Sequence, residues 1–125
     1  MAAVYDAGAL IAADRGDRRF LSDHRERIAA GVDVVIPAAV VAQVSRSPQQ
    51  ATMNQVIRSA QVIPLDERAA RSVGALLAEA GTADVVDGAV VAVARSFDAF
   101  IVTTDHDDIA TLCEAAGFET VIVEP

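Results

Sequence analysis

The sequence contains no lysine, no tryptophan and a single cysteine. All ten basic residues are therefore arginines, which excludes mechanisms that need a lysine amine, such as Schiff-base chemistry, P-loop nucleotide hydrolysis, Ser-Lys hydrolysis and lysine-dependent phospho-receiver signalling. Cys113 has no partner for an intramolecular disulfide. Its apolar surroundings, TLCEAAGF, predict a small core residue in a reducing compartment.

Positive charge is scarce, with 10 Arg against 18 Asp plus Glu and a formal net charge of -8. This acidic balance argues against nucleic-acid binding through bulk charge, because phosphate contacts need clustered cations. Contact with RNA or DNA would have to depend on metal ions or on a local arginine patch.

Long hydrophobic runs are also missing, since charged residues interrupt every apolar stretch well before membrane length. The N-terminal MAAVYDAGAL lacks a basic region and carries Asp6 too early for a signal peptide. We therefore expect a soluble cytoplasmic protein without a membrane partner. The 53% hydrophobic content, mostly Ala and Val, is enough for a single globular domain over residues 1–125.

Short Val- and Ile-rich runs alternate with longer segments of helical periodicity. The predicted strands are residues 2–6, 32–37, 60–65, 99–105 and 120–124. The predicted helices are residues 7–13, 17–30, 38–44, 50–58, 66–80, 84–96 and 109–116, with Gly81 as the stop of the fifth. This alternation predicts a three-layer α/β fold with a mainly parallel central sheet and helices on both faces.

Four aspartates fall at the places where such a sheet binds ligands. Asp6 and Asp105 end the first and fourth predicted strands, and Asp84 and Asp87 share one face at the start of an apolar helix. Ligands bind outside the carboxyl ends of parallel strands, so these carboxylates are expected to converge there.

Each aspartate alone also has a local explanation. Asp84 and Asp105 can cap the helices that follow them, Asp87 can interact with a helix dipole, and Asp6 can be a turn residue. Their coincidence in apolar surroundings favours a shared cation, because clustered carboxylates repel one another.

Oxygen ligands without a Cys or His cluster select Mg²⁺, with Mn²⁺ as the alternative. His24, in the charged run SDHRER, is expected to be solvated, and His106 is peripheral.

Four segments carry a resemblance to a known family: VYDAGAL with Asp6, PAAVVAQV after the second predicted strand, GTADVVDGAVVAVA with Asp84 and Asp87, and IVTTDHDD with Asp105. In order, spacing and strand context they resemble the PIN-domain ribonucleases and, within them, the VapC-like toxins of bacterial type II toxin-antitoxin systems. The resemblance covers essentially the whole chain. It implies a PIN-like fold and a Mg²⁺-dependent endoribonuclease, with a small antitoxin as partner and a homodimer as the assembly.

In the site implied by the resemblance, Asp6, Asp87 and Asp105 hold the metal, and Asp84 is a further ligand or orients waters. The family usually places a Glu on the helix after the second strand, where this sequence has Gln43. Asp108 is a candidate to compensate for the missing charge. Thr103 and Thr104 can donate hydrogen bonds to the carboxylates, although strand packing is the simpler role for Thr103.

Four arginines are candidates for contact with RNA phosphates or an acidic antitoxin segment: Arg15, Arg18, Arg19 and Arg46. A solvated charged loop is the alternative interpretation of the first three.

Two other functions stay open. One is a PIN-like binding module impaired by Gln43. The other is a metal-dependent phosphohydrolase with Asp6 as nucleophile, which the missing lysine and Ala7-Gly8 after Asp6 disfavour.

Overall fold

The structure, a computed structural model, describes residues 1–125 and contains five strands and seven helices. The strands are β1 (Ala2–Tyr5), β2 (Asp33–Pro37), β3 (Gln61–Ile63), β4 (Phe100–Val102) and β5 (Ile122–Val123). The helices are α1 (Ala7–Asp14), α2 (Arg18–Ala29), α3 (Ala38–Val44), α4 (Ala51–Arg58), α5 (Glu67–Ala80), α6 (Val85–Phe97) and α7 (His106–Ala115).

The strands form one sheet, entirely parallel, in the order β3-β2-β1-β4-β5. Val4 at the centre of β1 lies opposite Val35 of β2 on one side and Ile101 of β4 on the other. The chain therefore moves outward from β1 in one direction through β2 and β3, and in the other through β4 and β5. The order reverses between β1 and β4, which is the point where open α/β sheets bind ligands.

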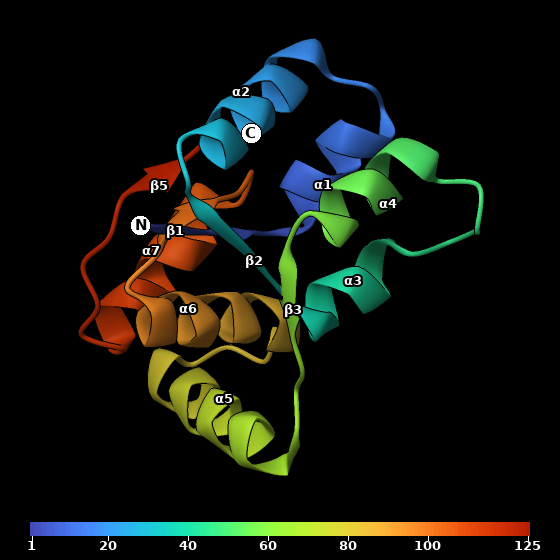
Figure 1. The fold of residues 1–125 in the computed structure, drawn as a ribbon. Coiled ribbons are helices and arrows are strands. Elements are labelled where there is room, and N and C mark those ends of the chain that lie inside the picture. The colour runs from blue at the N-terminus through green and yellow to red at the C-terminus, as the bar shows by residue number, and fades with distance from the viewer.

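Helices cover both faces of this sheet (Figure 1). Right-handed crossovers place α1, α2 and α4 on one face and α5, α6 and α7 on the other. Helix α6 contacts β1, β2 and β4 directly, and α5 packs on the outside of α6. The predicted three-layer α/β fold is confirmed.

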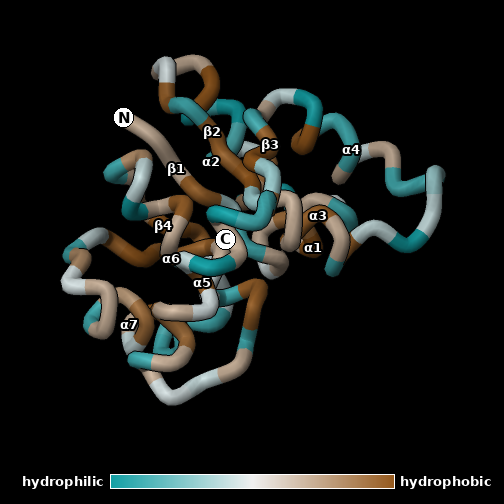
Figure 2. The backbone as a smooth tube through the Cα atoms, turned by 90° about the horizontal axis from the view of Figure 1, so that it is seen from below, coloured by the Kyte–Doolittle hydropathy of each residue, from teal (hydrophilic) through white to brown (hydrophobic).

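The hydrophobic core follows the central strands. All four residues of β1 are buried, and Figure 2 draws β1 and β2 in hydrophobic colours, whereas the segment between α3 and α4 is largely hydrophilic. Cys113 is buried, as the sequence predicts, and burial raises the pKa of its thiol. None of the seven helices combines the length and apolar character needed to cross a bilayer.

Two boundaries near the carboxyl end of β4 differ from those predicted. The strand predicted over 99–105 ends at Val102, and the helix predicted from residue 109 begins at His106. Asp107 and Asp108 occupy the first turn of α7, where negative charge stabilises the N-terminus although no apolar periodicity marks it. Asp105 is thus the residue before a helix rather than the last residue of a strand.

The prediction of a solvated His24 is wrong. Its side chain lies inside, because Phe20 and His24, four residues apart on α2, share the face that packs toward β1. The Ser59 hydroxyl donates to the Val56 carbonyl, so it accepts from His24 Nε2 at 3.0 Å, which leaves Nδ1 to accept from the Tyr5 hydroxyl at 2.8 Å. Burial and the nearby Arg27 and Arg25 charges lower the pKa of His24, so its neutral form fits this chain.

Candidate metal centre

Asp6 follows β1 directly and is the N-cap of α1. Its Oδ1 accepts from the Ala7 backbone N–H at 2.7 Å, and its Oδ2 accepts from the Thr103 hydroxyl at 2.7 Å. Only 2% of the residue is exposed. The structure thus makes Asp6 a helix cap, whereas the local alternative was a turn residue at the strand end. The cap places its buried carboxylate directly after the central strand, at the reversal point of the sheet.

Asp84 and Asp87 are fixed by the first turn of α6. Asp84 is the N-cap, and its Oδ1 accepts from the Asp87 backbone N–H at 3.0 Å. Asp84 is exposed, whereas Asp87 is buried on the inner side of the helix. The capping bond thus anchors the backbone of the residue whose carboxylate faces inward.

Asp105 occupies the N-cap position of α7 without a side-chain capping bond, so its exposed carboxylate is not held by the helix end. Its backbone N–H instead donates to the Thr103 hydroxyl at 3.0 Å. Since the same hydroxyl donates to Asp6, one buried threonine connects the backbone of Asp105 to the carboxylate of Asp6. Sequence reasoning favoured Thr104 for such a role.

Asp6, Asp87 and Asp105 each offer a carboxylate oxygen within 4.8 Å of the others. They come from the β1–α1 junction, α6 and the β4–α7 connection, at the carboxyl edge where the strand order reverses. Asp84 lies beside this group of three, which we call the aspartate cluster, and its charge acts on both Asp6 and Asp87.

The cluster is electrostatically costly without a cation. Burial raises the pKa of Asp87 to about 7, and the charges of Asp84, Asp6, Asp105 and Asp108 add to the shift. Burial also raises the pKa of Asp6, opposed by the hydrogen bonds from Thr103 and Ala7. Both carboxylates therefore need either protons or a nearby positive charge.

The donor set fits a hard divalent cation. All three converging groups are carboxylates, and no histidine or cysteine joins them. Mg²⁺ and Mn²⁺ prefer a few carboxylates and keep waters for a substrate, so Asp6, Asp87 and Asp105 have the right chemistry to hold either ion.

Three further residues were predicted near the site. Asp108 and Asp84 border a small hollow of about 160 Å³ that Asp87 also lines. Gln43 is exposed near the end of α3, a helix that contacts both α1 and α6, and Thr104 is exposed beside Gly8 of α1. Their roles toward a metal stay predictions.

The four candidate arginines lie elsewhere on the surface. Arg15 ends α1 and Arg18 begins α2, so both lie at the end of α1 opposite to Asp6, about 12 Å away along an eight-residue helix. Arg19 is exposed on the same turn of α2, and Arg46 donates to the carbonyls of Ala42 and Ser45. RNA or antitoxin contact by these residues stays a prediction.

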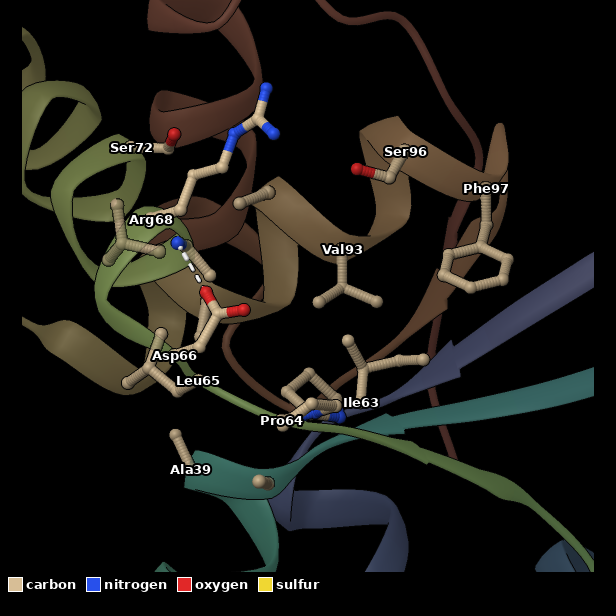
Figure 3. A pocket seen from close by; sticks show the side chains of 16 residues that line it. Ala39, Ile63, Pro64, Leu65, Asp66, Arg68, Ser72, Val93, Ser96 and Phe97 are labelled. Carbon is tan, nitrogen blue, oxygen red and sulfur yellow. Dashed lines mark hydrogen bonds between the residues drawn. The ribbon is translucent and has the colours of Figure 1, made fainter.

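A separate apolar hollow of about 440 Å³ lies between α3, the β3–α5 connection, α5 and α6 (Figure 3). Ile63, Pro64, Val93 and Phe97 line it, with Arg68 at its rim. No member of the aspartate cluster lines it, so this hollow is distinct from the candidate metal centre.

Replacing Thr103 by valine preserves the shape of the side chain but removes the hydroxyl. The Asp6 carboxylate and the Asp105 N–H each lose a hydrogen bond, so we expect unfolding free energy to fall by about 1 to 3 kcal/mol. Affinity for Mn²⁺ should fall by about 10-fold, a usual effect of losing a partner of a metal ligand. Denaturant titration measures the first effect and calorimetry the second, with Thr104→Val as the control. Equal unfolding free energies and Mn²⁺ affinities for the two variants would mean that Thr103 only packs.

No protein-family model matches the sequence, and no curated protein matches it. Among solved structures, the fold is similar to a chain of VapBC2 from Rickettsia felis bound to a DNA fragment from their promoter, with 14% identity, a TM-score of 0.67, and coverage of 99% of this chain and 98% of that chain. It is also similar to a chain of FitAB bound to IR36 DNA fragment, with 16% identity, a TM-score of 0.68, and coverage of 98% of this chain and 94% of that chain. A third is PAE2754 from Pyrobaculum aerophilum, with 18% identity, a TM-score of 0.60, and coverage of 94% and 99%. These matches confirm the PIN-like fold that the sequence resemblance implies.

Proposed function

We propose that this chain is a Mg²⁺-dependent endoribonuclease and the toxin component of a toxin-antitoxin pair. The observation that carries the proposal is the aspartate cluster at the reversal point of the sheet, in a fold shared over nearly the full chain with VapBC2 and FitAB structures. Mn²⁺ is the alternative ion.

In this proposal Asp6, Asp87 and Asp105 hold the cation, and Asp84 fixes the backbone of Asp87 through its capping bond. When bound, Mg²⁺ supplies Lewis acidity toward a phosphate and lowers the pKa of a water nucleophile. Thr103 keeps Asp6 oriented, and it ties the backbone of Asp105 to the same point. Asp105, the exposed member, is the one that a phosphodiester reaches from solvent.

The proposed partners are RNA as substrate and a small antitoxin as inhibitor. The similar VapBC2 and FitAB structures are named as pairs and are bound to DNA, which supports an antitoxin partner for this chain. With a formal net charge of -8, the protein has to attract RNA locally, through the cation and the exposed arginines. A homodimer is part of the proposal, as the resemblance implies.

The proposal is tested by incubating structured and unstructured RNA with the purified chain in Mg²⁺, in Mn²⁺ and in EDTA. We expect cleavage in Mg²⁺ or Mn²⁺ and none in EDTA, with restoration when the metal is returned. Cleavage that continues in EDTA would contradict the metal-dependent mechanism. Co-expression with the product of a neighbouring open reading frame should give a complex in which cleavage is suppressed.

A catalytically impaired PIN-like binding module is the second candidate, because exposed Gln43 contributes no charge where the family usually has a Glu. That function predicts RNA or partner binding without cleavage in any metal. A phosphohydrolase with Asp6 as nucleophile is less favoured, since the sequence has no lysine and carries Ala7-Gly8 where a second acid two residues after Asp6 would be expected.

Metal-free protein should lose stability as the pH rises toward neutrality because of Asp87. Its pKa is raised from the ordinary 3.8 to about 7, so the folded state favours the protonated form. The contribution of this group to the unfolding free energy is complete below pH 3.8 and is lost as the pH rises past 7. In EDTA, the unfolding free energy of the wild type should therefore decline relative to Asp87→Asn over this window. Denaturant titrations at several pH values measure the difference, and parallel curves for the two proteins would contradict it.

A further inference from the structure

Gly8, the second residue of α1, lies two residues after Asp6 at the aspartate cluster. Its φ is not among the positive values that favour glycine, and alanine is the better helix former. Neither conformation nor helix propensity therefore accounts for a glycine at this position.

The lack of room for a side chain next to Thr104 explains the glycine. A Cβ on Gly8 would lie 2.5 Å from Thr104 Oγ1, 2.7 Å from Cγ2 and 3.1 Å from Cβ. The first two separations are closer than real carbon contacts. Turning the threonine about χ1 does not resolve the conflict, because its own Cβ is already near and a β-branched residue keeps two heavy atoms on that carbon.

The displacement would fall on a short, tethered backbone. Thr103 is held on one side by its N–H bond to the Val123 carbonyl and its hydroxyl bond to Asp6, and Asp105 follows Thr104 directly. Movement of Thr104 away from α1 therefore displaces Asp105, the cluster member whose side chain lacks a capping bond.

We infer that Gly8 is a positioning residue: its missing side chain seats Thr104 against the first turn of α1 and so sets the distance between the Asp105 and Asp6 carboxylates. The inference rests on the proposed function, because it treats both aspartates as metal ligands. Thr104 itself makes no side-chain hydrogen bond, so its part is steric.

The test is Mn²⁺ binding measured by calorimetry on the full chain. Gly8→Ala should weaken binding by about 10-fold, as expected when the support of a ligand is disturbed. Adding Thr104→Ala should restore part of the affinity, and adding Thr104→Gly should restore most of it, because the latter removes all three crowded atoms. Gly74→Ala is the matched control, since Gly74 lies within α5 with nothing near its Cβ position.

A merely structural role for Gly8 would change thermal stability without this graded recovery of affinity. Two results would overturn the inference and leave the proposed function standing. In the first, Gly8→Ala binds Mn²⁺ with wild-type affinity. In the second, Gly8→Ala/Thr104→Gly still binds weakly although Thr104→Gly alone binds normally. Wild-type protein that binds no Mn²⁺ would overturn both the inference and the proposed function. If Gly8→Ala does not fold, the measurement is made on Gly8→Ala/Thr104→Gly. A double variant that folds and binds Mn²⁺ with near-wild-type affinity supports the inference, and one that unfolds or binds weakly overturns it.

Discussion

Replacing Asp6 by asparagine should reduce Mg²⁺-dependent RNA cleavage by about 100-fold or more, because the substitution removes a charged ligand at the buried centre of the aspartate cluster. The fold should survive. The oxygen of the introduced amide can still accept from the Ala7 N–H, and its nitrogen can donate to the Thr103 hydroxyl, which has a second lone pair beside the one used by Asp105.

In metal-free buffer the same variant should be at least as stable as the wild type. Burial and the Asp105 and Asp84 charges raise the pKa of Asp6, which means that the folded state disfavours its negative charge. A neutral asparagine removes this destabilisation, as protonation or a bound cation does in the wild type. Cleavage rates and EDTA melting curves measure the two effects. Asp98→Asn is the matched control, because exposed Asp98 has a φ of 49°, which asparagine tolerates.

The two measurements separate the possible outcomes. Full nuclease activity in Asp6→Asn would assign the cleavage to another site or another protein in the preparation. An unfolded variant would mean that the N-cap role of Asp6 outweighs its place in the cluster.

Replacing Gln43 by glutamate should tighten Mg²⁺ binding by about 10-fold or more, if this residue occupies the position where the family usually carries a Glu. A carboxylate about 4 Å from the ion contributes up to a few kcal/mol at an effective dielectric near 20, and repulsion from the aspartates subtracts from that gain. Calorimetry on both proteins measures the change directly.

The matched control is Gln55→Glu, the same substitution at an exposed position of helix α4. It changes net charge equally and should leave Mg²⁺ affinity nearly unchanged. Equal affinities for wild type and Gln43→Glu would mean that Gln43 points away from the ion and that the aspartates suffice. A cleavage rate that rises with affinity would identify the wild type as a weakened enzyme rather than a binding module.

The fold could be predicted from the sequence because its strands are short, β-branched and apolar on consecutive positions, which marks a sheet covered on both faces. Asp6 and Asp87 could be placed as well, because one follows a predicted strand and the other lies in the first turn of a predicted helix, and both positions fix where a carboxylate lies. Gly81 stops α5 in the left-handed conformation, as its position after an apolar stripe predicts.

What could not be predicted depends on which way a side chain turns. Thr103 and Thr104 are adjacent and chemically identical, and only the sheet register places one under Asp6 and the other against Gly8. His24 is surrounded in sequence by charges, and its four-residue spacing from Phe20 was the one signal of burial. The contacts of Gln43 depend on the packing of α3, which composition and periodicity do not determine.

The central position of the first strand also bears on when the aspartate cluster is completed during synthesis. The ribosome makes Asp6 and β1 before β2 and β3, and the neighbour of β1 on its other side, β4, comes with Asp105 only after them. A nascent chain can pair β1 with β2 early, yet its aspartate cluster stays incomplete until β4 and Asp105 have emerged. Prematurely ended translation products that lack β4 and Asp105 therefore carry no complete aspartate cluster, whatever fraction of the remaining sheet they form.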